Sequence, residues 1–193
     1  MSQKKKLSEI TEISSGYQFR RNTPEFSEGD IKYIQMRDVN NFDRIDIENV
    51  MNVNIDNFSS KHLLHYNDVL FKSRGTKTTS ALFDVEWENA IASHQFFVIR
   101  VKKKSLLPEY LVWFMNQEGS QIYFQSNRTG SYIPNVKRKV LEDFFVFIPP
   151  IEDQKKIIEV DLLKKKYKEL SLKKAELEEK YINSVLSRYL HKL

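Results

Sequence analysis

Residues 151–193 contain no glycine and no proline and are rich in Lys, Glu and Leu. A run of this length without either helix-breaking residue predicts one long helix. It follows Pro149-Pro150, which end the apolar stretch Phe144–Ile148. We therefore expect two parts, a globular domain over residues 1–150 and a single long helix over residues 151–193.

Apolar side chains recur along the predicted helix at heptad spacing, and the pattern moves by one residue near the end. That drift is typical of a nearly straight helix and disfavours a long supercoiled rod. An amphipathic helix of this kind is stable only when its stripe packs against a partner, either the preceding domain or a second chain. We favour a second chain. The expected dimer interface consists of Leu163, Tyr167, Leu170, Leu177, Tyr181, Ile182, Leu186 and Tyr189.

The first 150 residues predict a mixed domain, because their strand-like and helix-like patterns do not alternate regularly. Proline at the start of 108–115 occupies its favoured position in the first turn of a helix. The predicted elements used below are the strands 68–72, 95–101 and 144–148, the last of them buried, the helices 6–13 and 108–115, and a loop over 127–139. The fold class expected from these elements is α+β.

The sequence lacks the usual motifs of catalysis and cofactor binding. It has no cysteine, which excludes disulfides, thiolate metal sites and a cysteine nucleophile. Neither a Walker phosphate loop nor a G-x-G-x-x-G motif is present. His62 and His65 have no third ligand at metal-site spacing, so a surface or packing role is favoured over zinc. Ser93-His94-Gln95 has no nucleophile-elbow context and is interpreted as a polar cluster at a strand edge. We expect no enzyme activity, no cofactor and no metal.

Neither a signal-peptide pattern nor an apolar run of membrane-spanning length occurs in this sequence. The expectation is a soluble, cytoplasmic protein without membrane contact. Its net charge is only +5, but cations gather in two segments, 72–80 and 126–139, the first of which is rich in hydroxyls. Such segments suit contact with phosphates, and they equally suit solubilising surface loops.

Several motifs, in the right order along the chain, resemble those of one family. They are Leu7-Ser8-Glu9-Ile10, Ser15–Arg20, Ile31–Val39, Asn67–Gly75 with Asn67 in place of a usual glycine, Gly130–Val136 and Ile148–Ile157. Together they resemble a target recognition domain from the specificity subunit of type I restriction-modification systems.

The resemblance implies an architecture and a function. In the family that this chain resembles, a member contains two units in tandem. Each unit is a recognition domain followed by a long helix, and the two helices are antiparallel. This chain has one such unit and resembles a half-sized form. It is expected to work as a homodimer that reads a bipartite, palindromic site in double-stranded DNA. The implied protein partner is a DNA methyltransferase (modification) subunit; whether a restriction subunit also docks is left open.

Candidate DNA contacts come from the basic loops and from a basic segment near the N-terminus. Arg and Lys read guanine edges or bind phosphates, Asn reads adenine, and hydroxyls position phosphates. The candidates are Arg20, Arg21, Lys72, Arg74, Lys77, Thr78, Thr79, Arg128, Tyr132, Asn135, Lys137 and Arg138. For 130–136, a turn packed against the base of the helix is an equal alternative. The rival function is a coiled-coil interaction scaffold that does not bind DNA.

Overall fold

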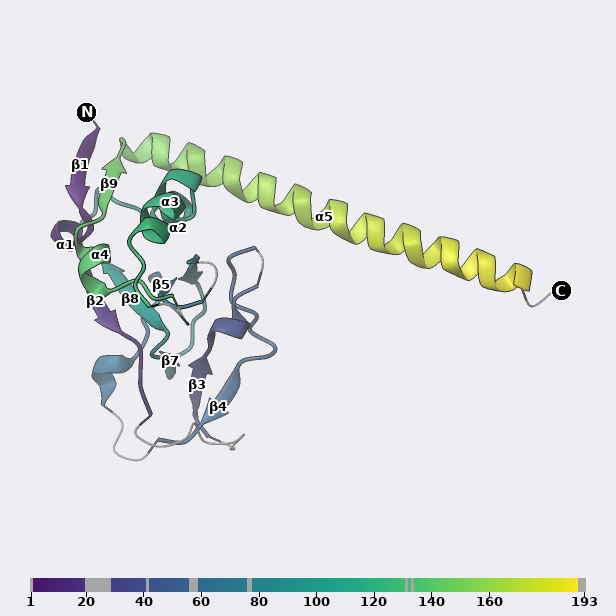
Figure 1. Ribbon diagram of the computed structural model, residues 1–193, viewed down its shortest axis with the longest axis horizontal. Helices are drawn as coiled ribbons and strands as arrows, with labels where there is room; N and C mark the ends of the chain where they lie inside the picture. Colours follow the sequence, from purple (N-terminus) through teal and green to yellow (C-terminus); the bar gives the residue numbers. More distant parts are fainter. Residues whose placement is uncertain are drawn as a thin grey trace. The chain divides into compact units, whose positions relative to one another are not determined.

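The structure is a computed structural model, and it describes residues 2–19, 29–40, 42–55, 59–75, 78–130, 132 and 134–190. It divides into two compact units, Met1–Lys155 and Lys156–Leu193, which we call the head and the stalk. The stalk is most of α5 (Ile151–Leu190), the first turn of which belongs to the head (Figure 1). An α+β head followed by a long C-terminal helix confirms the predicted fold class. In the described residues, no helix has the length and apolarity needed to cross a membrane.

The described residues of the head form three small sheets. The antiparallel four-stranded sheet has the order β2 (Thr11–Ser15), β8 (Phe96–Val101), β5 (Asp68–Lys72), β6 (Ser80–Phe83). The second sheet has the order β4 (Met51–Val53), β3 (Ile31–Ile34), β7 (Ala90–Ala92), with β3 and β7 parallel. A two-stranded ribbon joins β1 (Gln3–Lys6) to β9 (Phe145–Ile148). This ribbon and the β3–β4 pair lie at opposite ends of the head (Figure 1).

Strand β5 is buried on both faces, which explains its uninterrupted apolar run. Val69, Leu70 and Phe71 are all fully buried. Leu70 belongs to the core cluster shared with the three-stranded sheet. Phe71 points the other way, with its ring 4.8 Å from that of Phe124. Successive side chains of a strand face opposite sides, so a strand covered on both sides needs apolar residues throughout.

Helices cover the second face of the four-stranded sheet. They are α2 (Pro108–Met115), which contacts β5 and β6, and α3 (Glu118–Ser126), which carries Phe124. The other helical segments in the described part of the head are α1 (Leu7–Ile10), α4 (Arg138–Glu142) and two 3₁₀ turns, Met36–Asp38 and Ser60–His62. The predicted strand 68–72 and helix 108–115 are confirmed.

Three local predictions are wrong. The predicted helix 6–13 exists only over Leu7–Ile10, because the residues on either side pair as strands with β9 and β8. The predicted loop 127–139 includes the start of α4. The last strand is buried on one face only, since Phe145 and Phe147 are 46% and 48% exposed. Its sole strand partner among the described residues is β1, and the face that carries Phe145 and Phe147 is partly open to solvent.

The backbone conformation of Asn67 shows how asparagine can occupy a position before β5 that is usually glycine. Its φ is +71°, in the left-handed region that asparagine tolerates better than most residues other than glycine. Its N–H donates to the carbonyl of Phe83, and the next residue begins β5. Asparagine therefore replaces the glycine of the motif without losing the turn.

Gln154 attaches the first turn of α5 to the rest of the head. This side chain is fully buried. Its Oε1 accepts a hydrogen bond from the N–H of Leu107 at 2.9 Å. Its Nε2 donates to the carbonyls of Ser105 and Pro149, each at 2.8 Å. One amide thus satisfies three backbone groups around the two prolines that separate β9 from α5.

Candidate nucleic-acid interface

The two basic segments singled out in the sequence lie side by side in the head. The Val136 N–H donates to the carbonyl of Ser73 at 2.8 Å, and the Gly75 N–H donates to that of Pro134 at 3.3 Å. Arg74 and Asn135 form an isolated β-bridge. We call the described residues of 73–75 and 128–138 the basic ledge. Backbone pairing, which the sequence alone does not predict, places these two stretches of chain at one surface.

Side chains of the ledge differ in exposure. Tyr132 is 93% exposed, and Lys137 is exposed as well. Arg74 and Arg128 are partly buried. The Asn135 Oδ1 atom is buried and accepts no hydrogen bond from the described residues. Residues 134–136 pair with the described residues of the loop after β5, and Val136 is buried there.

The prediction for Thr78 needs correction. This residue is fully buried, and its hydroxyl donates to Oε1 of Gln121 on α3 at 3.0 Å. This side chain is therefore used to attach residue 78 to α3 and is not exposed to solvent. Thr79 stays partly exposed, and its carbonyl accepts the Lys72 N–H. Lys72 itself is half-buried with Nζ 3.4 Å from the carbonyl of Val39, and burial lowers the pKa of its ammonium group.

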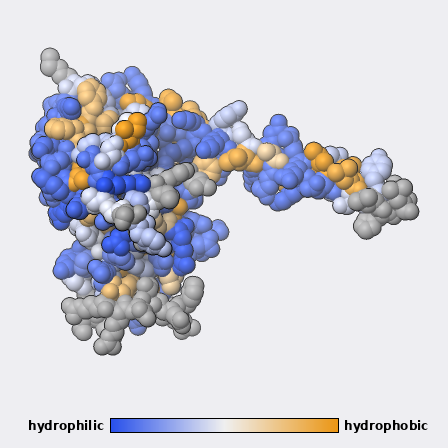
Figure 2. Space-filling model, in the orientation of Figure 1, coloured by the Kyte–Doolittle hydropathy of each residue, from blue (hydrophilic) through white to orange (hydrophobic). Residues whose placement is uncertain are grey.

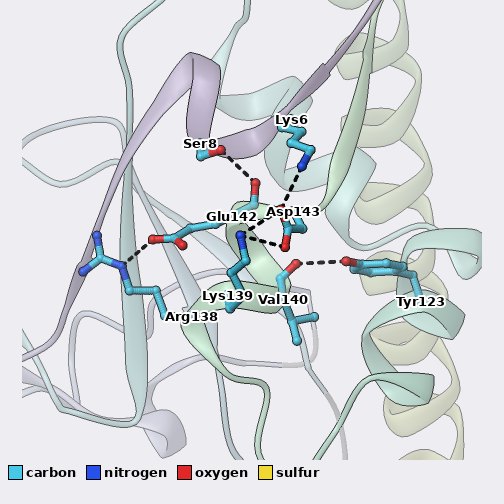
Figure 3. A network of polar contacts seen from close by, with 8 residues as sticks. All are labelled: Lys6, Ser8, Tyr123, Arg138, Lys139, Val140, Glu142 and Asp143. Atoms are coloured by element: carbon cyan, nitrogen blue, oxygen red, sulfur yellow. Dashed lines mark hydrogen bonds and ion pairs between the residues drawn. The ribbon is translucent and has the colours of Figure 1, made fainter.

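Arg138 is exposed but already has an acidic neighbour. Its Nε donates to Oε1 of Glu142, one turn later in α4, at 2.8 Å (Figure 3). In the same network Asp143 accepts hydrogen bonds from Lys6 and Lys139, and these bonds lower the pKa of its carboxyl group. The network ties the N-terminal segment to α4. A ligand phosphate would have to compete with Glu142 for Arg138. Of the two cations, Lys137 is therefore the more readily available for binding a phosphate.

Arg20, Arg21 and Lys77 lie outside the described residues. The segment that leads to the first two is described as far as Phe19. Tyr17 donates its N–H to the carbonyl of Ala92 at 2.7 Å and bridges to Ser93. A Cβ on Gly16 would fall 2.1 Å from the Ser93 oxygen, so only glycine allows this close approach.

The turn Ser93–Gln95 was not among the predicted site residues, yet it adjoins the ledge. The N–H and the hydroxyl of Ser73 both donate to the carbonyl of Gln95, at 2.9 and 2.8 Å. Burial and the nearby charge of Arg74 lower the pKa of His94. The sequence shows the polar cluster Ser93-His94-Gln95. It does not show that the cluster lies beside Arg74, because that position depends on tertiary pairing.

The stalk carries an exposed apolar stripe. All eight predicted interface residues are exposed, from 55% for Ile182 to 76% for Tyr167. Figure 2 shows apolar side chains recurring along this helix between polar ones. The predicted stripe is therefore present on the helix, and none of the described residues of the chain buries it.

No curated protein sequence matches the chain significantly. Among solved structures, it is similar to the S subunit of a type I restriction-modification system from M. genitalium, with a TM-score of 0.55 and 13% identity over 83% of this chain and 38% of that one. It is also similar to the HsdS subunit from Thermoanaerobacter tengcongensis, with a TM-score of 0.57 and 15% identity over 90% and 39%.

A third similar structure is described as the structural basis of complex assembly and conformational transition of the type I R-M system. Its TM-score is 0.60, with 18% identity over 92% of this chain and 41% of that one. At these identities the likeness shows the fold. The chain spans about two fifths of the length of each of these structures. Residues 2–180 match the family described as the type I restriction modification DNA specificity domain, and the chain therefore belongs to that family.

Proposed function

We propose that this chain is the DNA-recognition component of a type I restriction-modification system and that it performs no catalysis itself. The observation that carries the proposal is the meeting of two basic segments in one ledge, in a chain of the specificity family. Arg74 and Lys137 supply cations there, and Tyr132 supplies an exposed aromatic ring. Cations bind phosphates and guanine edges, which are the two main targets of DNA-binding side chains. Methylation and cleavage would belong to partner subunits.

The working unit in this proposal contains two chains whose stalks pair antiparallel. Leu170 and Leu177 are each 56% exposed. Complete burial of such a side chain contributes about 1.5–3 kcal/mol, so a stripe of eight supplies a strong driving force for association. Two identical heads related by a twofold axis would read a palindromic pair of half-sites. A DNA methyltransferase subunit would dock on this pair.

Mapping of methylated DNA in cells with and without the gene tests the recognition role. We expect one bipartite motif to lose its methylation when the gene is deleted, and its two halves to be inverted copies. Unchanged methylation at every motif would contradict DNA recognition. A motif with two different halves would leave recognition standing and refute the pairing of identical chains.

Sedimentation of the purified chain tests the pairing separately. Leu170→Glu combined with Leu177→Glu should yield a monomer at micromolar concentration, because four charges would enter the paired stripe. Leu172→Glu is the matched control: Leu172 is 57% exposed but lies outside the heptad seam, so this variant should remain a dimer. A monomeric wild-type chain would refute the pairing. A dimer that binds no duplex at low salt, even with its methyltransferase present, would instead indicate an interaction scaffold.

Arg74→Ala tests the ledge. We expect about tenfold weaker binding to duplex DNA, and a salt dependence with a slope smaller by about one if the lost contact is to a phosphate. Arg188→Ala on the stalk is the control and should bind as the wild type does. Dimerisation should be unaffected in both variants. Equal affinity of Arg74→Ala and the wild type would remove the ledge from the binding surface.

A further inference from the structure

We infer that the turn Ser93–Gln95 is the centre of the DNA-reading surface and that His94 and Gln95 contact base edges. The inference rests on the proposed function and adds specificity-determining residues to it. A search of the sequence for basic segments does not find these two residues, because the turn contains no Lys or Arg.

The turn joins the candidate DNA-binding segments through backbone hydrogen bonds. On one side, the Gln95 carbonyl accepts both the N–H and the hydroxyl of Ser73, the residue before Arg74. Ser73 in turn accepts the N–H of Val136, so the second basic loop is attached to the same point. Any duplex that contacts Arg74 therefore comes within reach of the neighbouring turn.

On its other side, the turn adjoins the segment that leads towards Arg20 and Arg21. Tyr17 pairs with Ala92 and Ser93, and Gly16 passes so close to the Ser93 carbonyl that a Cβ has no room. The turn is also held from within, because the Phe96 N–H donates to the Ser93 carbonyl at 3.0 Å. A base-reading residue must be held in place by its surroundings, and this turn is fixed from both sides.

Gln95 has the chemistry for reading a base. Its backbone carbonyl is used by Ser73, but its side-chain amide makes no hydrogen bond with any of the described residues. The side chain is partly exposed. A glutamine amide offers one donor and one acceptor, which match N7 and N6 of adenine in the major groove.

His94 offers a second pair of groups beside Arg74. It is partly exposed, and both burial and the charge of Arg74 lower its pKa. The lowered pKa favours the uncharged ring, which has one nitrogen as donor and the other as acceptor. An uncharged imidazole is suited to a base edge, whereas the adjacent guanidinium of Arg74 suits guanine or a phosphate.

The test maps the methylated motif in cells that carry the wild-type chain, Gln95→Ala, His94→Ala or Gln95→Glu. We expect Gln95→Ala to lower the preference at one base pair of each half-site by about tenfold, and His94→Ala to do so at a neighbouring position. Gln95→Glu should shift the preference towards cytosine, since a carboxylate accepts from its N4 amino group. The matched control is Gln125→Ala, an exposed glutamine of α3, which should leave the motif unchanged.

Each outcome separates the two proposals. Loss of preference confined to one position supports the inference. An unchanged motif in all three turn variants, with Arg74→Ala still weakening DNA binding, overturns it and leaves the proposed function intact. Uniform weakening at every position overturns it too, because the turn would then only support the surface. A wild-type chain that directs no motif refutes the proposed function, and the inference with it. Thermal unfolding of each purified variant should match the wild type, since neither side chain makes a hydrogen bond with any of the described residues.

Discussion

Replacing the buried amide of Gln154 should destabilise the head more than any change at its surface. In Gln154→Leu the N–H of Leu107 loses its acceptor, and the carbonyls of Ser105 and Pro149 lose their donor. A backbone group left buried without a partner costs about 1–3 kcal/mol. Ser105 is exposed, so water replaces the lost bond there, and two groups remain to be counted. Two groups at about 1–3 kcal/mol each give an expected loss of about 2–6 kcal/mol. This is a large part of the total stability of about 5–15 kcal/mol that is typical of a folded domain.

Urea unfolding followed by tryptophan fluorescence measures this loss, since both tryptophans, Trp87 and Trp113, lie in the head. The matched control is Gln125→Leu on the exposed side of α3, with an expected change within about 0.5 kcal/mol. A loss below about 0.5 kcal/mol in Gln154→Leu would show that this amide does not hold the start of α5, and the reasoning would fail.

The variant Gln154→Glu sharpens the same test through its pH dependence. The introduced carboxyl would face the two carbonyls that Nε2 now contacts, so its charged form is disfavoured and its folded-state pKa is raised above the unfolded value of about 4.3. Relative to the wild type, the variant should be most stable below pH of about 4.3. It should lose stability as the pH rises through the folded-state pKa. A difference from the wild type that is constant with pH would contradict this placement of the oxygens.

Three further predictions concern polar side chains of the head. The Tyr110 hydroxyl donates to a main-chain carbonyl of β9 at 2.8 Å, and burial raises the pKa of Tyr110 to about 12. Tyr110 should therefore be among the last tyrosines to ionise in an alkaline spectroscopic titration. Tyr110→Phe should lower the free energy of unfolding in urea by about 1 kcal/mol. Asp68→Asn should cost about 1–3 kcal/mol in the same assay, because it weakens a two-pronged pair with Arg100 that water reaches from one side. In an NMR titration, the pKa of His94 should lie below its usual 6.5, and Arg74→Ala should raise it. Because the folded-state pKa of His94 lies below the unfolded one, its contribution to stability is present above pH 6.5. That contribution is lost as the pH falls through the folded-state pKa.

The elements that were predicted correctly are those whose own sequence determines them. The strand 68–72 has a continuous apolar run, the helix 108–115 has proline at its start, and α5 begins directly after two prolines. Helix α3 was missed because Gly119 and Ser120 are poor helix formers. Tertiary packing holds it instead, through the ring of Phe124 between Phe71 and Phe144.

Strand β1 was missed for a related reason. Its sequence, Gln-Lys-Lys-Lys, shows no apolar alternation. It forms because β9 supplies the partner strand, with the Nζ of Lys4 and of Lys6 lying 4.8 and 5.9 Å from the ring centroid of Phe145. A partner about 140 positions along the chain cannot be found from local pattern. The candidate site has the same limit: its basic segments were recognised from composition, but their contact and the burial of Thr78 depend on pairing across the fold.

The way the ledge is held together bears on how specificity can change within this fold. Its segments are connected by backbone groups: Val136 to Ser73, Gly75 to Pro134, and Ser73 to Gln95. Backbone pairing depends little on the identity of the side chains, so the residues that face a ligand can be replaced without separating the loops. Two residues of the frame do not tolerate replacement. Gly16 allows the close approach of its backbone to the Ser93 carbonyl, and Gln154 attaches the start of α5 to the head. A frame fixed by its backbone, with variable side chains on its surface, is what a recognition domain needs if the same fold is to read different DNA sequences.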